Sequence, residues 1–246
     1  MAYDSFSEYY DLLMSDAGTA ERAAYYHSLI KSAGVDGGIL LDAGCGTGTM
    51  SVELSRAGYE VIGVDSSVGM LMKAREKAAA AGCDILLLNQ DMTALDLYGT
   101  VDCAVSAMDC LNHLENMAAV EAAFAGISLF MRPGGAFVFD MNTVYKHEQV
   151  LAGNTFVYDK PPVYCVWQNG ECENGRVEMS LDFFAEAEEG LYERSSEYFS
   201  ETAYDTGDIS LRLSKAGFEV RAVLDDMSGK DAHEKTERAV FLAVKR

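Results

Sequence analysis

The chain has 246 residues, 49% of them hydrophobic, and carries a formal net charge of −20. This length allows the core of one α/β domain with an additional element. A surface this acidic repels a phosphate backbone, so nucleic acid is not expected as a partner. A membrane is not expected either, because no apolar run reaches the roughly 18 to 20 residues of a span.

The first residues and the cysteines indicate where the protein acts. Residues 1–5 (MAYDS) lack the basic residues and the apolar segment of a signal peptide, so we expect a cytoplasmic protein. The six cysteines include no C-x-x-C pair, which favours reduced thiols over disulfides or a zinc site.

Two helices are predicted before the first strand. The segment Tyr3–Met14 carries aromatic side chains at spacings of three and four, namely Tyr3, Phe6, Tyr9 and Tyr10. Such a helix either covers a ligand cleft or packs on the core in the ordinary way. The second helix is predicted over Thr19–Ala33, with Thr19 as its N-cap and Gly34 at its end.

A glycine-rich turn follows the first predicted strand, the apolar run Ile39–Leu41. The strand ends at Asp42, and three glycines then follow at alternate positions, Gly44, Gly46 and Gly48. Glycines at this spacing remove every other Cβ from a tight turn, so the backbone can approach a ligand closely. We therefore expect a ligand on this turn.

A helix and a second strand complete this unit. Helical spacing begins at Thr49 and ends at Gly58, and the strand Tyr59–Val64 ends at Asp65. Strand, turn, helix and strand form a βαβ unit, which is right-handed in nearly all known proteins. A carboxylate at the tip of the second strand is placed to accept hydrogen bonds from ribose hydroxyls. The unit predicts a nucleoside-containing cofactor.

The spacing of the glycines distinguishes two cofactor classes. The dinucleotide fingerprint G-x-G-x-x-G needs a glycine where this chain has Thr49. The string D-A-G-C-G-T-G at 42–48 resembles instead the acid-x-G-x-G-x-G signature of class I S-adenosylmethionine (SAM)-dependent methyltransferases. The string M-R-P-G-G-A-F-V-F-D at 131–140 resembles that family's turn into strand five, and S-A-M-D-C-L-N-H-L at 106–114 is similar to a loop of small bacterial methyltransferases.

The remaining elements continue the α/β alternation. A helix capped by Ser66 or Ser67 is predicted to end at Gly82, and the elements predicted after it are the strands Cys83–Leu88 and Val101–Ala107, the helix Asn116–Met131, the strand Ala136–Asp140 and the helix Val144–Leu151. Beyond the segment 154–204, Asp208 is predicted to cap the helix Ile209–Ala216, and the strands Phe218–Leu224 and Ala239–Val244 follow.

The segment 154–204 has a different pattern. Asn169-Gly170 and Asn174-Gly175 are turn signals, and apolar and polar residues alternate from Val177 to Phe183. The pattern predicts an antiparallel β insert of three or four strands with one acidic face. Its carboxylates either attract a cationic amine or form an ordinary solvated face, and they include Glu178, Asp182, Glu186, Glu188 and Glu189.

The resemblance implies a doubly wound, Rossmann-like α/β fold with seven strands in the order 3-2-1-4-5-7-6, the seventh being antiparallel. We expect a single methyltransferase domain over 1–246, with a core of 1–153 and 205–246. The insert after strand five is expected to act as a substrate lid or as a contact in a homo-oligomer.

The resemblance also implies SAM as methyl donor and S-adenosylhomocysteine as product. In the family, an acid shortly after strand three binds the adenine amino group, and the next residue's N–H reaches the ring. Asp91 and Met92 match those positions, although Asp91 could instead only cap a turn. The predicted cofactor-binding residues are Tyr10, Asp42, Gly44, Cys45, Gly46, Gly48, Asp65, Ser66, Met70, Asp91, Met92 and Met108.

His113 is the candidate catalytic residue. Ligands of doubly wound sheets bind outside the carboxyl ends of the strands, which places the loop after strand four at the reacting methyl group. The imidazole could remove a proton from the acceptor, or it could orient the loop through a backbone hydrogen bond. We expect no metal, although Asp109, Asp140 and Asn142 could imitate an oxygen set for Mg²⁺.

The sequence thus predicts methyl transfer from SAM to a small-molecule acceptor by in-line displacement. One alternative is a catalytically inert SAM-binding module whose insert binds a protein partner. Another is a nicotinamide-dependent oxidoreductase, which Thr49 and the pair Asp91 and Met92 disfavour. The motifs specify the cofactor and carry no information about the acceptor.

Overall fold

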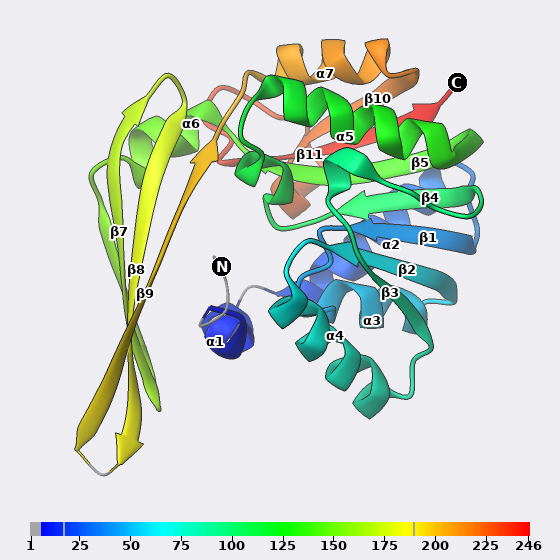
Figure 1. Cartoon of the computed structure of the whole chain (residues 1–246). Helices are drawn as coiled ribbons and strands as arrows, with labels where there is room; N and C mark the ends of the chain where they lie inside the picture. Colours follow the sequence, from blue (N-terminus) through cyan, green and yellow to red (C-terminus); the bar gives the residue numbers. More distant parts are fainter. Residues whose placement is uncertain (1–5, 17, 189) are drawn as a thin grey trace.

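The computed structural model describes residues 6–16, 18–188 and 190–246, which form two β-sheets with helices (Figure 1). The main sheet has seven strands in the order β3-β2-β1-β4-β5-β11-β10. Their bounds are β1 Gly38–Ala43, β2 Tyr59–Asp65, β3 Ile85–Asn89, β4 Val101–Ser106, β5 Met131–Asn142, β10 Phe218–Asp225 and β11 Arg238–Lys245. Because β10 and β11 are the sixth and seventh core strands, the predicted order is confirmed, as is the antiparallel pairing of β11 with β5.

Helices cover both faces of the main sheet. On one face, α2 (Thr19–Ser32) and α3 (Thr49–Arg56) enclose a core with Leu40 and Val105. On the other face, α5 (Met117–Phe130) and α7 (Thr206–Lys215) pack on Leu41 and on a cluster of phenylalanines from β5 and β11. Leu40 and Leu41 therefore point into opposite layers and are both fully buried. This two-sided burial explains why the strands are continuous apolar runs.

Local capping follows the sequence at most element ends. Ser67 accepts a hydrogen bond from Met70 N at the start of α4 (Val68–Ala81), and Gly82 ends this helix in the left-handed conformation. Two predicted caps are wrong. Asp205, not Asp208, caps α7 by accepting from Gly207 N, and α2 begins after Gly18 with Thr19 already inside the helix.

The second sheet is antiparallel, with the order β6-β7-β8-β9. Its strands are β6 Thr155–Lys160, β7 Val163–Glu173, β8 Arg176–Glu188 and β9 Leu191–Thr202, and α6 (Val144–Lys146) with the π-helical segment η4 (His147–Leu151) precedes them. The turn predicted at Asn169-Gly170 is instead an irregularity within β7, because β8 continues to pair on both sides of it. Glu189, a member of the predicted acidic cluster, lies outside the described residues.

Helix α1 (Phe6–Leu13) lies between the two sheets (Figure 1). Tyr9, Leu12 and Leu13 pack on the apolar face of the second sheet, where the ring centroids of Tyr9 and Phe183 are 5.8 Å apart. Tyr3, which was predicted to belong to this helix, lies outside the described residues. None of the described helices combines the length and the apolar character needed to cross a membrane.

Candidate active site

A cavity of about 870 Å³ lies at the carboxyl ends of the central strands, beside α1. It brings together residues that the sequence predicted separately from the first helix, the glycine turn and the ends of β1, β2, β3 and β4. The predicted residues that line it are Tyr10, Asp42, Gly44, Cys45, Gly46, Asp65, Ser66, Met70, Asp91, Met92, Met108 and His113. Gly48 is absent from this lining.

Hydrogen bonds fasten the glycine turn to the end of β2. The backbone N–H groups of Gly44 and Cys45 donate to Val64 O at 2.8 and 3.0 Å, and Gly46 N donates to Asp65 Oδ2 at 2.8 Å. Gly44, Gly46 and Gly48 all have positive φ, between 53° and 80°. The turn therefore holds its backbone in a conformation that favours glycine at each alternate position.

Two of these glycines have different surroundings. A Cβ added at Gly46 would meet no atom within 4 Å, whereas one at Gly48 would lie 2.9 Å from the Cβ of Ala74 on α4. Gly48 therefore allows α3 and α4 to pack closely behind the turn. The glycine pattern predicted a cofactor contact for Gly48 as well, because spacing alone does not separate a glycine that faces a ligand from one that faces a helix.

The two strand-end aspartates lie on either side of the turn and differ in environment. Asp42 is buried, and its Oδ2 accepts from Ser51 Oγ at 2.5 Å. Burial raises the pKa of Asp42 to about 7, and the charge of Asp65 adds to the shift. Asp65 is less enclosed and accepts from Gly46 N and Ser67 N, yet burial raises its pKa as well.

Asp91 is both a cap and a residue of the cavity. It precedes the short helix η2 (Met92–Ala94), and its Oδ1 accepts from Thr93 N and Thr93 Oγ1, both at 2.8 Å. The turn-capping alternative for Asp91 is thus present in the structure. It does not compete with ligand binding, because a carboxylate has lone pairs on both oxygens.

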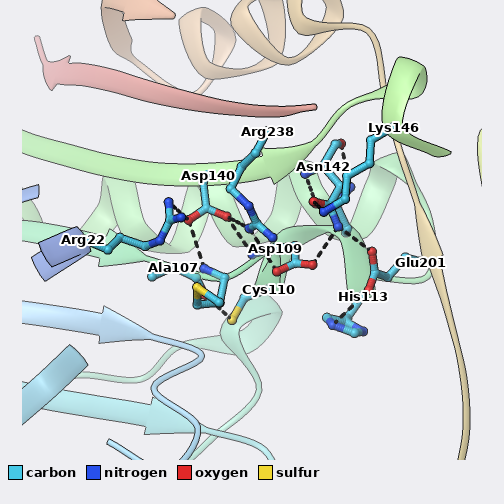
Figure 2. A network of polar contacts seen from close by, with 12 residues as sticks. Arg22, Ala107, Asp109, Cys110, His113, Asp140, Asn142, Lys146, Glu201 and Arg238 are labelled. Carbon is cyan, nitrogen blue, oxygen red and sulfur yellow. Dashed lines mark hydrogen bonds and ion pairs between the residues drawn. The ribbon is translucent and has the colours of Figure 1, made fainter. Parts of the chain in front are cut away.

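The loop after β4 has a strained backbone at the cavity. Met108 and Asp109 both have positive φ, 61° and 56°, which costs roughly 1 to 3 kcal/mol per non-glycine residue. Met108 N donates to Asp140 Oδ2 at 3.0 Å. Asp109 N donates to Asp140 Oδ1 at 2.8 Å (Figure 2). The fully buried Asp140 carboxylate therefore holds the backbone of Met108 and Asp109 in this conformation.

Arginines balance the charge of the buried Asp140 and of the partly buried Asp109. Arg238 donates to Asp140 Oδ1 and to Asp109 Oδ1, the latter at 3.0 Å, and Arg22 lies 3.8 Å from Asp140 (Figure 2). Burial alone would raise the pKa of Asp109, but the charges of Arg238 and Lys146 hold it well below its ordinary value. Of the oxygens considered for Mg²⁺, those of Asp109 and Asp140 thus contact the Arg238 guanidinium, and Asn142 Oδ1 accepts from Lys146 Nζ at 2.9 Å.

His113 lies on the short helix η3 (Cys110–His113) and lines the cavity. Its Nε2 is 3.7 Å from Oε1 of Glu201, which is buried at the end of β9. The neighbouring Asn112 side chain donates to Thr202 O at 3.1 Å and to Asn142 O at 3.0 Å. The second sheet and β5 together therefore position the loop that carries His113.

A further polar cluster, which the sequence analysis missed, joins α1 to the turn. Lys77 Nζ lies 2.7 Å from Asp11 Oδ2 and donates to Thr47 Oγ1 at 3.0 Å and to Thr49 Oγ1. Thr47 Oγ1 in turn donates to Asp11 Oδ1 at 2.6 Å. The contact links three separate elements, so no local pattern marks it. Glu201 was also missed, because its place opposite the buried Val177 follows from the register of β8 and β9, which the sequence does not show.

The site fits a SAM molecule by its own features. Gly46 leaves open space beside a turn that lines the cavity, Asp65 stands at the tip of β2 for ribose hydroxyls, and the volume is in the range of small-molecule sites, about 300 to 1,000 Å³. Residues that would hold the cofactor are thus present and adjacent.

Comparisons with known proteins agree with this geometry. Residues 40–135 match a family described as "Methyltransferase domain". A protein of Geobacillus sp. (strain WCH70), named "Putative methyltransferase", is 31% identical over the full length of both chains. A crystal structure of a SAM-dependent methyltransferase from Clostridium acetobutylicum ATCC 824 has a TM-score of 0.89 and 28% identity, covering 99% of this chain and 98% of that one.

A more distant structure shares the fold. The sugar N-methyltransferase KedS8 from Streptoalloteichus sp. ATCC 53650 superposes with a TM-score of 0.81 at 20% identity. The match covers 100% of this chain and 93% of the KedS8 chain. The full-length relative, the glycine turn at the cavity and the strand order lead to one conclusion: the chain belongs to the class I SAM-dependent methyltransferases.

Proposed function

We propose that this enzyme transfers the methyl group of SAM to a small-molecule acceptor. The observation that carries the proposal is that one cavity is lined by the glycine turn, the acids Asp65 and Asp91, and His113 together. Cofactor-binding groups and a candidate base thus face the same space of about 870 Å³. A volume of this size suits a nucleoside cofactor with a small partner.

In this proposal each side of the cavity holds one part of the cofactor. Asp65 accepts from the ribose hydroxyls, Asp91 and Met92 bind the adenine ring, and Asp42 with the turn binds the amino-acid tail. Bound SAM supplies a methyl carbon that its sulfonium charge already makes electrophilic. The protein therefore has to orient the acceptor and exclude water, which can contribute several kcal/mol to lowering the barrier. Tyr10 of α1 borders the cavity and contributes to this exclusion.

His113 is proposed to remove the proton from the acceptor. It lines the same cavity as Met108, on the loop that follows the carboxyl end of β4, where doubly wound sheets place their reacting groups. A positioned base of this kind typically contributes a factor of about 10² to 10⁴. We expect His113→Ala to lower kcat much more than it lowers SAM affinity, as measured by turnover and by calorimetric titration. Equal losses in both would reduce His113 to a scaffold role.

Charge and fold likeness support a small acceptor. The formal charge of −20 disfavours a polyanionic substrate such as nucleic acid. The shared fold with a protein named as a sugar N-methyltransferase supports a small acceptor. We propose the second sheet as a substrate lid, because it contacts both α1 and the loop of His113. A homo-oligomer contact is its other proposed role, and a cytoplasmic location remains our expectation.

Two experiments test the proposal. Titration of the melting temperature with SAM, S-adenosylhomocysteine and NAD should show a rise with the first two alone, because a ligand that binds only the native state stabilises it. Turnover of methyl-labelled SAM against a panel of small amines, hydroxyl compounds and thiols should then identify the acceptor. Stabilisation by NAD in place of SAM, or labelling of proteins or nucleic acid in a lysate but of no small molecule, would contradict the proposal.

A further inference from the structure

The thiol of Cys110 joins two loops that line the cavity. Cys110 begins η3, three positions before His113, and lines the cavity together with Gly44 and Ala107. Its Sγ donates to Gly44 O in the glycine turn at 3.2 Å and to Ala107 O directly after β4 at 3.0 Å. Figure 2 shows the contact with Ala107. One side chain thus bridges the turn after β1 and the loop after β4.

The peptide group between Gly44 and Cys45 is held from two sides. Its N–H, which belongs to Cys45, donates to Val64 O at the end of β2 at 3.0 Å, and its C=O, which belongs to Gly44, accepts from Cys110. Because β1 lies between β2 and β4 in the main sheet, the turn is fastened to the ends of both neighbouring strands. The attachment to β2 is made by backbone atoms alone, whereas the attachment to the loop after β4 depends on one thiol.

The sulfur also packs directly on the backbone of the turn. A Cβ added at Gly44 would lie 2.8 Å from Cys110 Sγ and 3.0 Å from Cys110 Cβ, closer than side-chain atoms normally pack. Tightly packed groups transmit displacements to one another. A shift of η3 would therefore move the glycine turn, and a shift of the turn would move η3.

The thiol keeps its hydrogen at neutral pH. Burial raises the pKa of Cys110 well above its ordinary value, and the charges of Asp65 and Asp109 add to the shift. A protonated thiol can donate to a carbonyl oxygen, and it is a far weaker nucleophile than a thiolate. The side chain is therefore suited to holding the turn in place beside an electrophilic methyl donor without being methylated itself.

We infer that Cys110 is a positioning residue that fixes the spacing between the glycine turn and His113 through its contacts with Gly44 O and Ala107 O. The inference rests on the proposed function, in which the turn binds the amino-acid tail of SAM and His113 receives the acceptor's proton. In-line transfer needs the acceptor atom, the methyl carbon and the sulfur of SAM in one geometry, and a misplacement of about 1 Å can cost on the order of 10²-fold in rate. Cys110 thus keeps the cofactor side and the acceptor side of the cavity in register.

Three variants of the full-length protein separate the hydrogen bond from the remaining effects of the substitution. Cys110→Ala removes the donor, Cys110→Ser retains one, and Cys83→Ala alters a half-buried cysteine outside the cavity lining as a control. Amide hydrogen exchange of Cys45, followed by NMR in the ligand-free protein, should be about fivefold faster in Cys110→Ala, because the peptide group has lost one of its two attachments. The rates in Cys110→Ser and Cys83→Ala should stay within about twofold of the wild type.

The same variants test the effect on the cavity. S-adenosylhomocysteine should bind about three- to tenfold more weakly to Cys110→Ala, measured by calorimetric titration, and with nearly wild-type affinity to Cys110→Ser. Once an acceptor has been identified, Cys110→Ala should lower kcat about tenfold or more, with a smaller change in the KM for the acceptor. Recovery of kcat in Cys110→Ser would show that the donor, and not only the fold, is needed.

Several outcomes would overturn the inference. Wild-type exchange and affinity in Cys110→Ala would do so, and so would equal losses in Cys110→Ala and Cys110→Ser. If Cys110→Ala fails to fold, the infrared difference between wild type and Cys110→Ser isolates the S–H stretching band of Cys110. A band below the frequency of a free thiol supports the hydrogen bond, and a band at that frequency contradicts it. Failure of the wild type to bind S-adenosylhomocysteine would instead count against the proposed function, while exchange and infrared spectra still test the contact in the ligand-free protein.

Discussion

Three aspartates at or just after the carboxyl ends of neighbouring strands have the same side chain but different surroundings. Asp42 is buried and accepts a hydrogen bond from the Ser51 hydroxyl, and burial raises its pKa to about 7. Asp109 has Arg238 and Lys146 nearby, which lower its pKa despite burial. Asp65 is held by two backbone N–H groups at the cavity. Neighbouring charge and solvent access thus decide the role of each carboxylate.

Asp65→Ala should weaken the binding of S-adenosylhomocysteine at least about tenfold, because a hydrogen bond to a charged group contributes roughly 1.5 to 3 kcal/mol. Isothermal titration calorimetry measures the change. Asp84→Ala is a matched control, since Asp84 is exposed at the opposite end of β3. Affinity that is unchanged in Asp65→Ala would reject the ribose contact.

Asp42 should make stability depend on pH. Its folded pKa of about 7 lies above the ordinary value of 3.8, so the folded protein retains a proton that the unfolded chain has lost between these values. The free energy of unfolding should therefore fall as the pH rises from about 4 to 7 and then level off with respect to this group. Urea denaturation of wild type and Asp42→Asn at a series of pH values isolates the effect, because Asn cannot titrate. Parallel curves for the two proteins would show that Asp42 does not titrate in this range.

At the scale of the element, the glycine turn has one side for a ligand and one side for packing. The cavity lies beside Gly46, while α4 lies against Gly48. The same positive φ therefore serves two purposes at positions two residues apart. Substitution of each glycine by alanine separates binding from folding.

Gly48→Ala should lower the free energy of unfolding by about 2 to 5 kcal/mol, the sum of left-handed backbone strain and of a Cβ forced against Ala74. Gly46→Ala should cost only the strain, about 1 to 2 kcal/mol, yet it should weaken S-adenosylhomocysteine binding because its Cβ enters the space beside the turn. Urea denaturation and calorimetry give the two quantities. The opposite ranking in either measurement would show that the two sides are wrongly assigned.

At the scale of the whole molecule, α1 connects the two sheets across the cavity. Its apolar side packs on the second sheet, and Asp11 on its other side contacts Lys77 and Thr47. Glu201 and Asn112 form a second connection between the same sheet and the loop of His113. The second sheet is therefore coupled to the cofactor side and to the acceptor side of the cavity.

Lys77→Gln should loosen α1, because it removes the charge that Asp11 faces. We expect faster amide hydrogen exchange in α1 and faster release of S-adenosylhomocysteine, measured by mass spectrometry and stopped-flow fluorescence. Arg75→Gln, at an exposed position of the same helix, serves as the control. Equal exchange rates in the two variants would show that the Lys77 cluster does not hold α1 in place.

Local patterns were sufficient for much of the architecture. The alternation of apolar strands and amphipathic helices predicted the main sheet, and motifs resembling those of a known family predicted its strand order. The predicted helix caps and turns were less accurate where two neighbouring residues could both cap a helix, or where one residue pair suits two backbone structures. Asp205 and Asp208 are both good N-caps, and an Asn-Gly pair fits a bulge as well as a turn.

The sequence by itself determined the glycine turn, the strand-end acids and the position of His113 after β4, because each depends on sterics and periodicity within a few residues. Only the tertiary structure decided the contact of Glu201 with His113 and His147, the pairing of Arg238 with Asp140, and the anchoring of α1 by Lys77. These contacts join residues that are distant in the chain, such as Lys77 and Asp11, 66 positions apart. Their formation depends on the register and packing of complete elements, which no short stretch of sequence contains.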